Sequence, residues 1–597
     1  MAVRRAVFQV VFLSCLLALA GLGRGADDED AKLTAFFKEF LEESFRQRPT
    51  EASGLGDHRF DDKLDDISPA ARKTWQDYRQ KVLRELPQRV EYKKLSRSGQ
   101  IDFEIFKHHL TREIWLAENT HPFEEDPRVY NEYITGSTYQ LLTQSTLPKA
   151  TNVKNAAARM LHIPKIVAAA RQSLKNPPRV VVETAIAQNK GAIGFYEHGI
   201  FEVAGETPQL SELSGPGRAL VPVLKEYQKF LEDDLLPRAK GEWRIGKEKF
   251  ARKLELELDA GLTAAEVLAE AEREADRVER EMYVIARHLW ATTAGERGVS
   301  TPRLPLPPDD ADGRRSTIRQ VLAFYAKDHG KPAEIAKDAR ATVAQIKEFI
   351  AKNDILRLPD PDRCAVIEMP EFQRGNSTAF LNPAPPLDPK AQSVYAVSPP
   401  PKDWDDRRVQ SYLEEYNRYM VQILTIHEAY PGHYVQLEYS NRHPSLVRRV
   451  LSSGIFAEGW AVYTEQMMLD QGYGNGDLAL RLHQLKWYLR AVTNAILDHK
   501  MHAGAMSDAE AMTLLTQHAF QSEGEAFKKV IRAKQSSCQL STYFVGRTAF
   551  YRLRQQVQRE QADKFDLGRY HEAVMAHGTL PVKYLPELVR ERLKTPR

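Results

Sequence analysis

The sequence contains very little cysteine: three residues in 597, one of which, Cys15, lies in the N-terminal apolar run. The other two, Cys364 and Cys538, allow at most one disulfide bond, so a disulfide-stabilised scaffold is excluded and stability must come from the hydrophobic core. Internal repeats and low-complexity tracts are also absent. With 42% hydrophobic and 28% charged residues, the composition is that of an ordinary globular protein, long enough for several structural units.

The chain also lacks a surplus of charge of either sign. It has 84 Lys and Arg residues against 81 Asp and Glu residues, a formal net charge of +3. Residues 1–25 contribute three arginines and no acid, so the remainder is formally neutral. Nucleic-acid-binding proteins usually concentrate a basic surplus on one face. We therefore expect no nucleic-acid partner.

Only one long apolar run occurs, from Val7 to Leu22. Two arginines precede it and small residues follow at Gly23 and Gly25, which is the arrangement of a secretory signal peptide. An uncleaved membrane anchor is the alternative, but the run is shorter than the roughly 20 residues that a spanning helix needs. The sequence predicts that residues 1–25 are a removable signal peptide. The protein is then exported, periplasmic or secreted, without a stable membrane span after processing.

Helical periodicity dominates the rest of the chain. Apolar residues recur every three or four positions from Leu33 to Leu41, which predicts a helix that ends near Pro49. The segment 301–315 (TPRLPLPPDDADGRR) is rich in proline and aspartate and cannot continue a helix, so it is predicted to link two halves. Helix is expected to resume at Ser316.

Three short strands are predicted between the helices of the second half. The segments 364–372, 378–383 and 393–399 are separated by proline-rich turns. The predicted fold is mainly α, with two large helical halves that bound a cleft and one small sheet that lines this cleft. The N-terminal helical half is residues 26–300 and the C-terminal half is residues 316–597.

The candidate chemistry is carried by a helix expected from Arg407 onward. Its apolar stripe reaches His427, which is followed by Glu428 and, six residues after His427, by His433. Imidazoles bind Zn²⁺ as neutral ligands, and an adjacent glutamate can accept a proton from a zinc-bound water. In the usual HExxH motif the histidines are four residues apart and share one helix face.

A spacing of six places the two histidines on different faces of an ideal helix. Both can bind one metal only if the helix is interrupted, and Pro431 and Gly432 provide such an interruption. The alternative is that these residues simply end the helix and leave His433 in a loop.

Glu458 is the candidate third metal ligand. It interrupts the apolar helical run IFAEGWAVYTEQ, where a carboxylate is costly to bury unless it is paired or bound to a cation. Glu465 lies seven residues later on the same helix face and could hydrogen-bond a ligand histidine. The alternatives are a buried salt bridge for Glu458 and an exposed helix position for Glu465.

The segments HEAYPGH and AEGWAVYTE together resemble the bacterial family known as domain of unknown function 885. Further resemblance lies in PTEASGLGDHRFDD (49–62), VIEMPEF, TAFLNPAPPLDP and QLSTYFVG (539–546). The family is similar to helical gluzincin metallopeptidases such as the thimet oligopeptidase and Taq carboxypeptidase groups, and dipeptidyl peptidase III also has a stretched His-Glu motif. The resemblance implies His427, His433 and Glu458 as metal ligands and Glu428 as the catalytic base. Many relatives carry a second histidine where this chain has Tyr434.

Other polar residues are weaker candidates. Tyr543 matches the Gln-x-x-x-Tyr-x-x-Gly pattern of the family and could donate to a developing oxyanion, although a packed helix tyrosine explains it nearly as well. Asp498 and His502 lie four residues apart on one helix face, where a structural hydrogen bond is the simpler interpretation. His571 and His577 have no identifiable partner in the sequence.

These features predict an exported zinc-dependent hydrolase, more specifically a metallopeptidase with one Zn²⁺ per chain and Glu428 and Tyr543 as its catalytic residues. The expected fold is a large two-half metallopeptidase-like architecture, with the small sheet near the metal site and residues 316–597 as the catalytic half. Its expected partner is a peptide or another small amide substrate. The alternatives are a zinc hydrolase of non-peptide amides or esters, and a non-catalytic helical binding protein with a structural metal. A structural site would have no use for a base beside its first ligand. The sequence does not indicate the oligomeric state.

Overall fold

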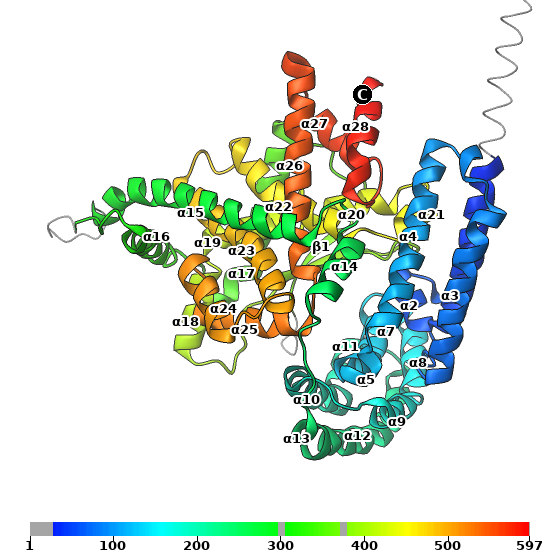
Figure 1. Ribbon diagram of the computed structural model, residues 1–597. Helices are drawn as coiled ribbons and strands as arrows, with labels where there is room; N and C mark the ends of the chain where they lie inside the picture. Colours follow the sequence, from blue (N-terminus) through cyan, green and yellow to red (C-terminus); the bar gives the residue numbers. More distant parts are fainter. Residues whose placement is uncertain (1–27, 296–304, 370–378, 596–597) are drawn as a thin grey trace, which may run out of the picture.

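The computed structural model describes residues 28–295, 305–369 and 379–595 (Figure 1). Over these residues the protein is mainly α-helical with one small β-sheet, as the sequence predicts. The predicted signal peptide lies outside the described residues. Among the described helices, none is both long enough and apolar enough to cross a membrane.

The N-terminal helices form a bundle packed through aromatic side chains. The predicted stripe is buried on a helix that spans residues 28–47, and Phe37 meets Phe106 at a ring-centroid distance of 4.9 Å. Ser68 and Ser96 begin the two long helices by accepting hydrogen bonds from backbone amides in the first turn. The two long helices are α3 (Pro69–Arg89) and α4 (Arg97–Asn119), and the bundle also contains α2 (Pro49–Leu55) and α14 (Lys247–Leu258).

A second group of helices has a hydrophobic core of its own. Its buried side chains come from residues 67–239, with Ile134, Tyr196 and Leu224 almost fully shielded from solvent. Its helices lie together in the lower part of Figure 1. They are α5 (Pro122–Glu125), α6 (Arg128–Asn131), α7 (Ser137–Thr143), α8 (Lys149–Met160), α9 (Ile163–Ser173), α10 (Arg179–Gly194), α11 (Ile200–Ala204), α12 (Ser214–Lys229) and α13 (Leu236–Arg238).

The remaining helices surround the predicted metal site. One continuous hydrophobic cluster contains buried residues from Leu33 to Val589, so the N-terminal bundle and the C-terminal helices share a core. These helices are α15 (Ala264–Gly295), α16 (Ala311–Tyr325), α17 (Ile335–Lys352), α18 (Asp406–Glu415), α19 (Arg418–Glu428), α20 (His433–Asn441), α21 (Leu446–Val450), α22 (Gly454–Asp470), α23 (Leu478–His502), α24 (Asp508–Thr513), α25 (Glu523–Gln535), α26 (Thr542–Gln561), α27 (Leu567–Met575) and α28 (Leu585–Lys594).

Two predicted helix boundaries are wrong. Helix α16 begins at Ala311 rather than Ser316, because the Asp310 side chain accepts a hydrogen bond from the Gly313 amide and caps the helix inside the acidic segment. The helix expected from Arg407 is two helices, because Asn417 ends the run and caps α19 through the amides of its first turn. The division of the chain into two halves around 301–315 stays a prediction.

The three predicted strands are present in the described residues and form one sheet. They are β1 (Cys364–Glu368), β2 (Ala379–Asn382) and β3 (Ser393–Val397), in the order β1-β3-β2. Strand β3 is parallel to β1 and antiparallel to β2, with Leu381 opposite Tyr395. Because β2 is at the edge, one row of its backbone groups faces away from the sheet, toward α19.

The N-terminal segment 49–62 holds the connection between β2 and β3 in place. The amide of Leu387 donates to the carbonyl of Leu55, and the His58 ring lies between two carboxylates, 2.9 Å from Asp61 and 3.3 Å from Asp388. This contact joins residues about 330 positions apart. It supports the strand that borders the candidate site.

Candidate metal centre

Helix α19 brings His427 and Glu428 to the centre of the molecule. Its buried face includes Met420, Ile423 and Leu424, and His427 is the next residue on this stripe, only 6% exposed. Burial of one face against the core therefore fixes where the imidazole lies, because positions four apart share a helix face.

The chain breaks its helix between the two histidines, as Pro431 and Gly432 predict. Helix α19 ends at Glu428, and α20 starts at His433. A Cβ atom on Gly432 would lie 2.0 Å from the carbonyl oxygen of His427, so only glycine allows this close approach. The Trp460 indole donates to the Pro431 carbonyl over 2.8 Å and ties the turn to α22.

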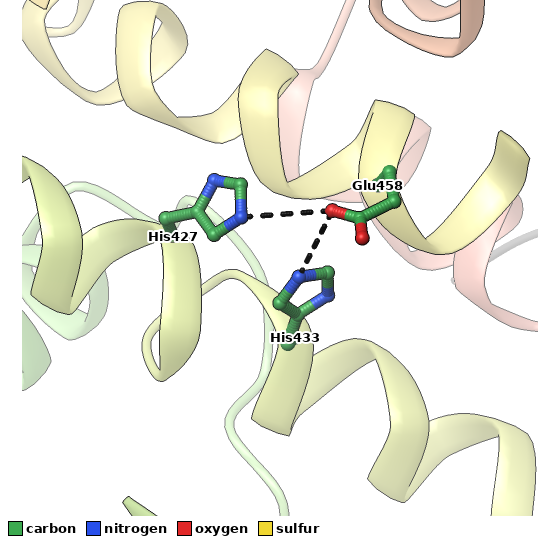
Figure 2. A group of neighbouring side chains, drawn as sticks. All are labelled: His427, His433 and Glu458. Atoms are coloured by element: carbon green, nitrogen blue, oxygen red, sulfur yellow. Dashed lines mark ion pairs between the residues drawn. The ribbon is translucent and has the colours of Figure 1, made fainter. Parts of the chain in front are cut away.

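The break allows the two imidazole rings to lie close together. Their centroids are 4.8 Å apart, with ring planes nearly perpendicular. Glu458 of α22 points between them, as Figure 2 shows, with Oε2 at 3.7 Å from His427 Nε2 and 3.4 Å from His433 Nε2. One ligand atom from each of the three residues lies within 4.8 Å of the others. The structure thus brings together the three residues that the sequence proposes as ligands.

The geometry of this group fits a zinc ion. Zinc ligands at about 2.0–2.1 Å in a tetrahedral arrangement are about 3.4 Å from one another. The separation of Glu458 Oε2 from His433 Nε2 equals this value and that from His427 Nε2 is about 0.3 Å longer, and this buried oxygen makes no hydrogen bond within the described residues. Burial alone would raise the pKa of Glu458, but the two imidazoles outweigh burial and hold the pKa below its ordinary value. The carboxylate is therefore kept in the charged form that binds a cation.

Glu465 occupies the position expected of a residue that orients a ligand. Its Oε1 lies 2.7 Å from Nδ1 of His427, and its side chain is fully buried. Burial works against a charged imidazole, but the carboxylates of Glu458 and Glu465 raise the pKa of His427 well above its ordinary value. With Nδ1 engaged by Glu465, Nε2 of His427 is directed toward Glu458.

Glu428 is oriented by the edge of the sheet and not by the three candidate metal ligands. Its Oε2 accepts a hydrogen bond of 3.0 Å from the amide of Leu381 in β2. Glu428 also lines a cavity of about 330 Å³ together with His427 and Tyr543. A carboxylate, one candidate ligand and a phenol therefore border the same cavity.

Comparison with known proteins identifies the family. Residues 49–589 match the family described as "Bacterial protein of unknown function (DUF885)". The chain belongs to this family. Among solved structures it is similar to a candidate lipoprotein of unknown function from Shewanella oneidensis, with 30% identity, a TM-score of 0.77, and coverage of 94% of this chain and 99% of that one.

A second solved structure shows the same fold. It is a candidate lipoprotein from Colwellia psychrerythraea, with 16% identity, a TM-score of 0.76, and coverage of 95% of this chain and 99% of that one. At this identity the likeness concerns the fold alone. No curated protein matches the chain.

Two segments that resemble the DUF885 family, AEGWAVYTE in α22 and QLSTYFVG at the start of α26, meet at a glycine contact. A Cβ atom on Gly459 would lie 2.4 Å from the Cα of Gly546, and a Cβ on Gly546 would lie 2.1 Å from the Ile455 carbonyl oxygen. Helices α22 and α26 can therefore approach closely only because both positions are glycine. Tyr543 of α26 lines the cavity, and burial together with the nearby charge of Glu458 in α22 raises the pKa of Tyr543.

The region before Tyr543 is fixed by two buried polar residues of α23. Asp498 accepts hydrogen bonds from the Cys538 amide and the Ser541 hydroxyl, and His502 Nε2 is 2.7 Å from the Ala533 carbonyl oxygen. The two side chains do not face the cavity, in agreement with the structural interpretation. Tyr543 itself receives hydrogen bonds from Arg532 and from Gln539, which hold its hydroxyl beside the cavity.

Three other residues considered from the sequence lie away from the three candidate metal ligands. The Tyr434 hydroxyl accepts a hydrogen bond of 2.6 Å from the Arg363 amide, so His433 and not residue 434 faces Glu458. His571 is buried between the Tyr463 hydroxyl and the Ile355 carbonyl, and burial lowers its pKa to about 3. Burial also lowers the pKa of His577 to about 4.

Sequence reasoning missed the basic side chains that line the cavity. These are Arg490, Lys528, Lys529 and Arg532. Lys529 could have been found, because the buried stripe of α25 is Ala526, Lys529, Val530 and Ala533, which places a lysine at a core position. The arginines are ordinary helix residues in the sequence, and only the folded arrangement brings them together.

Proposed function

We propose that this DUF885 protein is an exported, zinc-dependent hydrolase that cleaves peptide bonds. The observation that carries the proposal is the meeting of His427, His433 and Glu458 beside a cavity that Glu428 also lines. Three protein ligands with open space next to them are typical of catalytic zinc sites, whereas structural sites are closed by a fourth ligand. A zinc ion held by these ligands would supply a Lewis acid and make a water molecule more acidic.

The residues around the ligands have complementary roles. Glu428 is oriented through Oε2 by the Leu381 amide, which leaves Oε1 to accept a proton from the attacking water. The Tyr543 hydroxyl, held by Arg532 and Gln539, is the donor available to the oxygen of the carbonyl under attack. Glu465 positions His427 and takes no direct part in the reaction.

The sheet edge favours an extended substrate. Ala379 lines the cavity, and the amide of Leu381 points outward to Glu428, so this edge of β2 borders the site. An extended peptide can add to such an edge through main-chain hydrogen bonds, which would place one of its carbonyl groups near Glu428. This arrangement is the reason to prefer a peptide over a non-peptide amide or ester.

Export is part of the proposal. The two similar solved structures are described as candidate lipoproteins, which are exported proteins, and this chain begins with a predicted signal peptide. N-terminal sequencing of the protein from the producing cells tests this part. A chain that begins near Ala26 supports it, and a chain that still begins at Met1 in the membrane contradicts it.

Metal analysis combined with a peptide-library cleavage assay tests the function. We expect about one zinc ion per chain, loss of cleavage on chelation, and recovery on addition of zinc. Zinc without cleavage of any library peptide would favour a non-peptide substrate or a binding protein. Absence of zinc after purification in zinc-containing buffer would contradict the proposal.

A further inference from the structure

The cavity beside the cluster has a strongly cationic wall. Four basic side chains line it, and apart from Glu428 the only acid among its described lining residues is Glu525. The cations come from α23 and α25, whereas the candidate ligands come from α19, α20 and α22. The cationic wall is defined as Arg490, Lys529 and Arg532, and it combines a half-buried arginine, a buried lysine and an exposed arginine that all line the cavity.

Lys529 is the most unusual member of the cationic wall. Its side chain is 4% exposed, and it makes no ion pair or hydrogen bond within the part of the chain that the structure describes. Burial, together with the nearby charges of Arg490 and Arg532, lowers its pKa well below the ordinary value. A buried amine without a partner is costly, and an anion in the cavity would remove that cost.

Arg490 is also incompletely paired. Its Nη1 is buried and makes no hydrogen bond within the described residues, while Nη2 lies 3.4 Å from Glu525. Its guanidinium lies 4.8 Å from the centroid of the Trp487 ring, which fixes its plane. A planar guanidinium with a free N–H group is suited to a planar carboxylate.

Arg532 connects the cationic wall to the proposed catalytic residues. Its Nη2 donates to the Gln539 side chain over 2.7 Å and to the Tyr543 hydroxyl over 3.3 Å. A group bound by the wall would therefore lie close to Tyr543 and Glu428. The volume of about 330 Å³ is at the lower end of the range of ~300–1,000 Å³ for small-molecule sites, which suits the end of a chain better than its middle.

We propose that Arg490, Lys529 and Arg532 form a subsite for the free C-terminal carboxylate of a peptide, so that the enzyme removes residues from the C-terminus. The inference rests on the proposed peptidase function, and it names the substrate class of that site. Hydrolysis adds the elements of water across the peptide bond nearest the carboxylate. The products are a shortened peptide with a new C-terminal carboxylate and the released C-terminal amino acid with a free amine.

The experiment measures binding as well as cleavage. The probes are three N-terminally labelled oligoalanines: one with a free C-terminal carboxylate, one with a C-terminal amide, and one amidated peptide that carries a glutamate side chain near its end. Affinities are measured by fluorescence anisotropy with the Glu428→Gln protein, so that cleavage does not consume the probe. The same three peptides are tested for cleavage by the wild-type enzyme.

We expect the free carboxylate to bind roughly 10- to 100-fold more tightly than the amide. Introduced into the Glu428→Gln protein, Lys529→Met and Arg490→Met should each reduce this ratio toward one. Because Lys529→Met replaces a buried amine that has no hydrogen-bond partner among the described residues, the melting temperature of this variant should be equal to or above that of its parent. Lys534→Met is the matched control on α25, since Lys534 pairs with Asp508 outside the cavity, and it should keep the ratio.

Equal affinity for carboxylate and amide, or a ratio that neither variant changes, would overturn the inference. Tight binding of the amidated glutamate peptide would also overturn it, by assigning the wall to acidic side chains. A carboxylate preference in binding without cleavage of any probe by the wild type would support the anion subsite while contradicting the peptidase function. The two failures are thus distinguishable.

Discussion

Nδ1 of His427 lies 2.7 Å from Oε1 of Glu465, and both side chains are buried. The two residues come from α19 and α22, the same helices that carry His427 and Glu458 as candidate ligands. The contact therefore fixes the ring of one ligand relative to the helix of another. The contribution of this pairing to metal binding can be tested separately from that of the ligands.

Replacement of Glu465 by glutamine should weaken zinc binding without abolishing it. The amide keeps the size of the carboxylate but loses the charge that supports the His427 imidazole as a ligand. Residues that hydrogen-bond to a ligand typically contribute about 10- to 100-fold to metal affinity. Competition with a chelator of known affinity measures the effect. An affinity equal to that of the wild type would show that Glu465 only packs against His427.

Removal of a ligand should have a larger effect. His427→Ala, His433→Ala and Glu458→Ala each leave two protein ligands, so zinc should be lost during dialysis against a mild chelator. Tyr434→Phe is the control, because it removes only the hydroxyl that bonds Arg363 and should retain zinc. Metal content per chain is the measurement. Full occupancy in the His433 variant would exclude that residue from the site.

The contact between α22 and α26 should not tolerate a methyl group. In Gly546→Ala the new Cβ meets backbone atoms, so the helices must separate, at a cost of about 1–3 kcal/mol in the free energy of unfolding. Turnover should fall too, because Tyr543 moves with α26. Gly454→Ala at the start of α22 is the control, since nothing lies within 4 Å of its Cβ position. The measurement is the melting temperature of both variants. Equal melting temperatures for Gly546→Ala and Gly454→Ala would contradict the close packing of α22 and α26.

His58 should make stability depend on pH. The hydrogen bond to Asp61 raises the pKa of His58 above 6.5 despite partial burial, and Asp388 adds to the effect. Because the folded state binds the proton more tightly, this stabilisation is complete below pH 6.5 and is lost as the pH rises through the raised pKa. His58→Gln should lower the melting temperature by about 1–2 °C at pH 5.5 and by less at pH 9.

The control for that experiment is His198→Gln, which changes an exposed histidine and should not alter the pH profile. A difference between wild type and the His58 variant that is the same at all pH values would exclude a charged His58. Loss of the contact should also loosen the connection between β2 and β3, because His58 joins it to the N-terminal bundle.

Much of the local structure could be predicted from the sequence. The apolar stripe of residues 33–41, the three strands, and the break at Pro431 and Gly432 all follow from spacing and backbone chemistry. The approach of Glu458 to the two histidines was predicted from its position in an apolar helix. Apart from the approach of Glu458, these are local patterns, and each requires only one element to be recognised.

Most other contacts between distant elements could not be predicted. Leu381 reaches Glu428 only because β2 is the edge strand beside α19, and the sequence does not reveal the strand order. The cap at Asp310 was missed because an acidic, proline-rich segment was interpreted as linker throughout. The cationic wall joins α23 to α25, and only the folded structure brings Arg490 beside Lys529.

The central claim is that Glu428 is a base and not a ligand. Peptide turnover measured beside zinc content, for the wild type and Glu428→Gln, tests it most directly. We expect zinc to be retained while turnover falls roughly 10²- to 10⁴-fold, because glutamine cannot accept the proton of the attacking water. Tyr543→Phe should retain zinc with a smaller loss, because only one oxyanion donor is removed. Undiminished turnover by zinc-loaded Glu428→Gln would contradict the account.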